Sequence, residues 1–86
     1  MKDMLLGGIY QEYAGERFVR VLSLWPDDAD SQDVQRVPDA PYQAKRGFAT
    51  IVTWNVLQNV PAGRPTFAKM SRFNGKSGGY KFIKRI

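Results

Sequence analysis

The residues of this chain that could do chemistry are mostly cations, and they are gathered in its second half. From Ala40 to Ile86 the sequence has nine basic and no acidic residues. The first 39 residues have four basic residues and all eight acidic ones, so the two segments carry formal net charges of −4 and +9. A short chain whose charge is divided in this way presents a cationic surface to an anionic partner.

The segment 66–86 alternates these cations with aromatic rings, as a nucleic-acid-binding surface requires. Cations neutralise phosphates, and exposed rings stack on unpaired bases of DNA or RNA alike. We predict phosphate contacts from Lys69, Arg72, Lys76, Lys81, Lys84 and Arg85, and stacking from whichever of Phe67, Phe73 and Tyr80 are exposed. If the rings form the core instead, Arg72, Lys81 and Arg85 still make a basic stripe on the outer side.

A second candidate surface is acidic. Asp27, Asp28, Asp30 and Asp33 follow Trp25, which ends an expected strand and should be half-exposed. Their spacing lacks the central glycine and terminal glutamate of a calcium loop, so we predict no metal site. The loop suits a basic protein partner, or it folds over the basic half and competes with phosphate. The alternative function is therefore a protein–protein module, or a small inhibitor of the kind that phages encode. Such a protein would act through this loop, a sheet edge, its basic face or as a homodimer.

Groups for catalysis are scarce. The chain has no Cys and no His, so thiol nucleophiles, the commonest general base and the commonest zinc ligand are missing. We predict no enzyme activity and no cofactor. The glycine-rich stretch 74–79 lacks the spacing of a P-loop. The apolar run before Gly7 is too short for a signal peptide or a membrane span, so we expect a cytoplasmic protein without membrane contact.

Strands must position these groups, because no segment keeps a helical period. Five segments rich in β-branched and aromatic residues are predicted as strands: 8–13, 17–25, 48–57, 66–73 and 80–86. The segment 26–46, with three prolines and five aspartates, is predicted to be a long acidic loop that contains a helical turn near Ser31–Arg36. The strands 66–73 and 80–86 are predicted to form a terminal hairpin.

Two further features of register follow from the pattern. A turn at residues 14–15 would place Glu12 opposite Arg17 and Tyr10 opposite Val19. In the strand 48–57 the bulkier of the two faces is predicted to be the core face, with Trp54 buried. That face consists of Phe48, Thr50, Val52, Trp54 and Val56.

The first hairpin also carries a family resemblance. Its spacing of Gly8, Tyr10, Tyr13, Gly15, Phe18 and Val21 resembles the first hairpin of SH3-like domains. It is also similar to a small uncharacterised bacterial family that opens with Gly-x-Tyr-x-x-Tyr-x-Gly. The resemblance covers residues 8–22 and implies a binding fold without an activity. We predict one all-β domain, a strongly bent, five-stranded antiparallel SH3-like barrel, with an OB-like barrel or an open sheet as alternatives.

Overall fold

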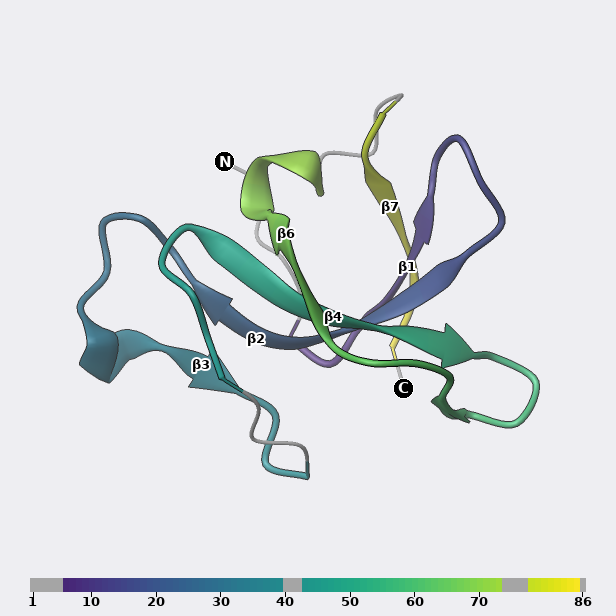
Figure 1. Cartoon of the computed structure of the whole chain (residues 1–86), viewed down its shortest axis with the longest axis horizontal. Coiled ribbons are helices and arrows are strands. Elements are labelled where there is room, and N and C mark those ends of the chain that lie inside the picture. The colour runs from purple at the N-terminus through teal and green to yellow at the C-terminus, as the bar shows by residue number, and fades with distance from the viewer. Residues whose placement is uncertain (1–5, 40–42, 74–77, 86) are drawn as a thin grey trace.

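The computed structural model describes residues 6–39, 43–73 and 78–85, and within them every regular element is a strand or a short 3-10 turn (Figure 1). No helix among these residues is long and apolar enough to cross a membrane. The elements are β1 (Ile9–Glu12), β2 (Phe18–Trp25), η1 (Ser31–Asp33), β3 (Gln35–Arg36), β4 (Phe48–Asn55), β5 (Val60–Pro61), β6 (Thr66–Lys69), η2 (Met70–Arg72) and β7 (Tyr80–Lys84).

The strands form one antiparallel sheet in the order β5–β4–β2–β1–β7, with β3 added to β2 and β6 added to β4. The prediction of an all-β antiparallel fold is confirmed. The sheet has seven strands rather than five. The two additional strands have two residues each: β3 lies inside the predicted loop, and β5 lies between the predicted strands 48–57 and 66–73. The helical turn predicted in the long acidic loop is η1. We call residues 26–39 of this loop, which contain all its aspartates, the acidic connection.

The predicted terminal hairpin is wrong. β6 pairs with β4, where Lys69 lies opposite Phe48, and β7 pairs with β1, where Phe82 lies opposite Tyr10. Between them, η2 turns the chain away from β6 (Figure 1). This arrangement gives β4 and β1 each a further hydrogen-bonding partner, which a local hairpin would not do. Within the described residues no pairing between β6 and β7 is found that would close the sheet, so closure into an SH3-like barrel stays a prediction.

The first hairpin has the predicted register. Tyr10 lies opposite Val19, and the Glu12 amide donates to the Arg17 carbonyl at 3.1 Å. The Glu12 carboxylate also accepts from the Arg17 guanidinium at 3.1 Å. A cross-strand ion pair therefore joins the two strands next to the turn of this hairpin.

The sheet buries side chains on both of its faces. The inner face holds the larger core cluster, which consists of Tyr10, Val19, Val21, Leu24, Ala49, Ile51, Ala68, Phe73 and Tyr80. The outer face holds a smaller cluster of Ile9, Leu22, Val37, Val52 and Trp54. Trp54 is buried as predicted, but the larger core uses Ala49 and Ile51, which the comparison of bulk had assigned to the other face. Small side chains such as Ala49 and Ala68 leave room on the inner face for the aromatic rings of β1 and β7.

Candidate functional site

Aromatic and basic side chains meet on the outer face of β2, β4 and β6. Residues that lie opposite one another on neighbouring antiparallel strands share a face. Trp25, Phe48 and Lys69 are aligned in this way, and Phe67 is aligned with Thr50 in the next row. We call the resulting set of rings and cations the aromatic–cation surface; it consists of Trp25, Lys45, Arg46, Phe48, Phe67 and Lys69.

The rings of this surface are accessible to different degrees. Phe67 is 45% exposed, whereas Trp25 and Phe48 are half-buried. The rings of Phe48 and Phe67 contact each other edge to face, with their centroids 6.3 Å apart. Phe67 thus offers a ring held in place by a neighbouring ring, at a position where a planar ligand could stack on it.

The cations lie over the faces of these rings. The Lys45 ammonium is 4.4 Å from the centroid of Phe48 and 5.9 Å from that of Phe67, and the Arg46 guanidinium is 5.1 Å from that of Trp25. Lys45, Arg46 and Lys69 are all exposed. Cation–π attraction at exposed sites is about 0.5–1 kcal/mol, which orders these side chains without neutralising their charge.

The segment 43–47 holds the two cations over β4. The Thr50 hydroxyl donates to the Gln43 carbonyl at 2.8 Å, and the Gly47 amide donates to the Trp25 carbonyl at 2.6 Å. Gly47 has a φ of +83°, and a Cβ at this position would clash with the Asp27 carboxylate. The Asp27 side chain is exposed and could move aside, so it is the positive φ that favours glycine in the turn before β4.

The rings predicted at the end of the chain are placed differently. Phe73 is 7% exposed and Tyr80 is 1% exposed, and the two rings stack on each other with centroids 4.6 Å apart. The condition for base stacking is therefore met by Phe67 and not by Phe73 or Tyr80. The Arg72 guanidinium covers this pair, 4.8 Å from the centroid of Tyr80, and donates to the Gly78 carbonyl at 3.3 Å.

The predicted basic residues do not share one strand pair. Lys69 belongs to β6, at one end of the path β6–β4–β2–β1–β7, while Lys81 and Lys84 belong to β7 at the other end. The Lys81 ammonium is 5.4 Å from the ring centroid of Tyr13, which is 49% exposed. Arg85 follows β7, and Lys76 lies outside the described residues. The structure thus joins Lys69 to Lys45 and Arg46, which the sequence had not singled out.

The acidic connection borders the aromatic–cation surface. Asp27, Asp28, Asp30 and Asp33 are all exposed, and η1 lies at the outer end of the connection, away from the body of the sheet (Figure 1). Arg46 donates to the Asp27 carbonyl at 3.1 Å and to the Ala29 carbonyl at 2.8 Å. Among the described residues, no three acidic side chains come close enough together to hold a metal ion.

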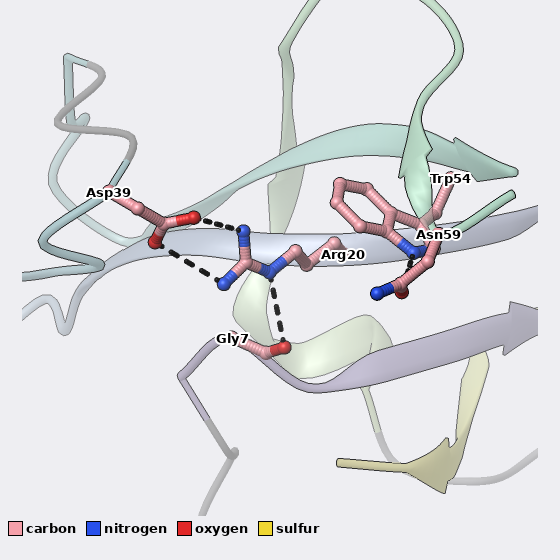
Figure 2. A network of polar contacts seen from close by, with 5 residues as sticks. All are labelled: Gly7, Arg20, Asp39, Trp54 and Asn59. Carbon is pink, nitrogen blue, oxygen red and sulfur yellow. Dashed lines mark hydrogen bonds and ion pairs between the residues drawn. The ribbon is translucent and has the colours of Figure 1, made fainter. Parts of the chain in front are cut away.

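A second polar cluster surrounds Arg20, and its only sign in the sequence is a charged residue inside a predicted strand. The two Nη atoms of Arg20 donate to the two carboxylate oxygens of Asp39, at 3.1 and 3.4 Å, and Nε donates to the Gly7 carbonyl at 3.3 Å. Figure 2 shows the Arg20 guanidinium between the Asp39 carboxylate and the Trp54 ring. The hydrogen bonds from Arg20 lower the pKa of the Asp39 carboxyl below its ordinary value.

One signal in the sequence could have found Lys45 and Arg46. They are adjacent cations that directly precede Gly47 and the most strongly β-forming segment of the chain. Cations that directly precede a strand lie close to the rings on that strand, and also to the rings on a neighbouring strand that pairs with it.

No family model matches the chain, and comparisons with curated proteins and with solved structures gave no match.

Proposed function

We propose that this protein is a small non-catalytic module that binds single-stranded nucleic acid through its aromatic–cation surface. The observation that carries the proposal is the position of Phe67. Its ring is 45% exposed, contacts Phe48 and lies on the same outer face as Lys69, with the Lys45 ammonium close by. Rings beside cations match the two components of a single strand, which are bases with π faces and phosphates.

The expected energetics are divided between these two components. A base stacked on an exposed ring contributes about 1–3 kcal/mol, and this contribution depends little on which base it is. Each neutralised phosphate adds an electrostatic contribution that weakens with salt. Binding should therefore be salt-sensitive and only weakly specific for sequence.

The acidic connection would limit the path of the strand. Because Arg46 holds the backbone of Asp27 and Ala29 beside the surface, the carboxylates of this connection repel phosphate on that side. A bound strand is then expected to run from Phe67 toward Lys69 rather than toward η1. Replacing Asp27, Asp28, Asp30 and Asp33 by Asn should accordingly strengthen nucleic-acid binding.

The test is fluorescence anisotropy with labelled single- and double-stranded oligonucleotides at two salt concentrations. We expect single strands to bind more tightly than duplexes, and Phe67→Ala to weaken binding by about 5- to 100-fold, the equivalent of losing one stacked base. Phe82→Ala is the matched control, because Phe82 is the same residue type with the same 45% exposure on β7. Equal effects of the two substitutions, or no binding at low salt, would exclude the proposal.

A second candidate function is protein binding at the edge of β7. Among the described residues β7 pairs only with β1, and Phe82 and Ile83 are 45% and 38% exposed. A partner could add a strand at such an edge, with main-chain hydrogen bonds giving affinity and these apolar side chains giving specificity. Loss of partner binding in Phe82→Ala, with nucleic-acid binding absent in the wild type, would favour this function.

A further inference from the structure

A pocket open to solvent lies outside the aromatic–cation surface and shares no residue with it. The pocket has a volume of about 410 Å³, within the range of roughly 300–1,000 Å³ that is typical of small-molecule sites. It lies where the turn before β1, the middle of β2, the end of the acidic connection and the residue after β7 come together. Its apolar wall consists of Leu6, Val37 and Pro38, and its charged groups are Arg20, Asp39 and Arg85.

Arg20 is fixed before any ligand arrives. Its side chain is only 11% exposed, its Nε donates to the Gly7 carbonyl, and its guanidinium is 5.2 Å from the centroid of the Trp54 ring. The Trp54 indole in turn donates to Asn59 Oδ1 at 3.1 Å (Figure 2). A guanidinium held in this way loses little conformational entropy when it binds an anion.

Asp39 occupies the place that a ligand anion would take. Both of its oxygens accept from the Arg20 fork, which is the geometry by which arginine also binds phosphate. In contrast to Arg20, the Asp39 side chain is 65% exposed, so it can leave the fork for solvent at little cost. Arg85 adds a second positive charge to the same wall.

We propose that this pocket binds a phosphate monoester, and that Asp39 is a built-in competitor that leaves Arg20 when the ligand enters. A ligand carboxylate or an internal phosphodiester carries one negative charge, as Asp39 does, and gains no electrostatic advantage over a tethered carboxylate. A phosphate monoester carries a charge of about −1.5 to −2 at neutral pH. It can therefore displace Asp39 and engage Arg85 as well, while its organic part covers Leu6, Val37 and Pro38.

This proposal is independent of the proposed function, because the pocket shares no residue with the aromatic–cation surface. A small phosphorylated molecule and the phosphorylated end of a nucleic acid share the same chemistry, so the probes have to distinguish these two sources. The probes are adenosine 5′-monophosphate, inorganic phosphate, and one oligonucleotide with either a 5′-phosphate or a 5′-hydroxyl. Adenosine is the uncharged control. Binding is followed by the amide chemical shifts of Gly7, Arg20 and Asp39 in nuclear magnetic resonance titrations.

The decisive variant is Asp39→Asn, for which the proposal predicts tighter binding of the monoester by about tenfold, since the competing charge is gone. Asp33→Asn removes an exposed charge outside the pocket and should change the affinity less than twofold. Arg85→Gln should weaken binding, and because Arg85 is exposed this variant should remain folded. Inorganic phosphate has no base to stack on Phe67, so its effect on the amides of Gly7, Arg20 and Asp39 separates this site from the aromatic–cation surface.

The outcomes separate the two sources of phosphate. A gain in Asp39→Asn for adenosine 5′-monophosphate or inorganic phosphate assigns the pocket to small phosphorylated molecules. A gain seen only for the 5′-phosphorylated oligonucleotide assigns it to nucleic-acid ends. The proposal is overturned if Asp39→Asn leaves monoester binding unchanged or weaker, or if neither wild type nor this variant binds any phosphorylated probe at millimolar concentration.

Discussion

β6 and β7 both carry aromatic and basic residues, yet the fold uses the rings of the two strands in opposite ways. In β6 the ring of Phe67 is 45% exposed beside Lys69 on the outer face. In β7 the ring of Tyr80 is 1% exposed and stacks on Phe73 in the larger core. Phe82 contacts Tyr10 at the margin of that core, with ring centroids 5.5 Å apart.

The partner strand causes this difference. β6 lies beside β4, whose outer row of Phe48 and Thr50 continues into Lys69 and Phe67. β7 lies beside β1, and Tyr80 and Phe82 continue the row of Glu12 and Tyr10. A register shift near Ile9 then places both Lys81 and Lys84 on the outer side. Two strands that both carry aromatic and basic residues therefore provide a stacking surface in one case and core side chains in the other.

The largest expected effect tests the core role of β7. Tyr80→Ala should lower the free energy of unfolding by about 3–5 kcal/mol, because it removes a fully buried ring from a small core. Phe82→Ala, on the same strand but 45% exposed, should cost about 1 kcal/mol or less. Urea denaturation followed by tryptophan fluorescence measures both values. Equal losses would mean that the Phe82 ring contributes to the core as much as the Tyr80 ring does, which would contradict its position at the margin of the core.

A smaller effect compares the cations of the two strands. In the double variant Lys45→Gln with Lys69→Gln, the slope of log K against log salt for a single strand should become shallower by about 1.4, or ~0.7 for each lost phosphate contact. The matched double variant Lys81→Gln with Lys84→Gln removes the same charge from the β7 side and should change this slope less. If the β7 pair has the greater effect, the nucleic-acid surface lies on β7 and the assignment to β6 is wrong.

The smallest effect concerns the pH dependence of stability that Asp39 causes. Asp39 belongs to the acidic connection and lines the same pocket as Arg85, the residue after β7. Its pKa is lowered from the ordinary value of 3.8, first of all by the hydrogen bonds from Arg20. The stability from this ion pair is therefore present above pH 3.8 and is lost as the pH falls through the lowered value. Asp39→Asn should show a slightly weaker loss of stability on acidification than wild type, measured by urea denaturation at a series of pH values. Identical acid dependence would contradict the Arg20–Asp39 pair.

The strands themselves could be predicted from the sequence where local signals agree. The turn after Glu12 and the β-branched run of β2 predict the first hairpin and its register, including the Glu12–Arg17 pair. The polarity of 26–46 predicts an irregular connection, and η1 lies inside it. The core face of β4 could not be predicted from side-chain volume. The face of β4 that packs in the larger core, with Ala49 and Ile51, also has to leave space for the rings of Tyr10 and Tyr80.

The candidate site was only partly accessible to the same reasoning. Lys69 and Phe67 were named from their alternation, but their neighbours Lys45 and Arg46 come from a segment about 20 residues earlier in the chain. They meet because β6 crosses to β4 instead of folding back with β7. The pocket around Arg20 combines residues from both ends of the chain, and no local pattern links them.

The sequence by itself determined the charge division, the absence of Cys and His, and the alternation that makes each strand two-sided, because these depend only on residue type and on the two-residue period of a strand. Tertiary structure decided which of the two sides is buried and which rings meet which cations. Those choices depend on strand pairing between distant segments, and pairing is selected by the burial of the whole core and the hydrogen bonding of every strand rather than by any local signal.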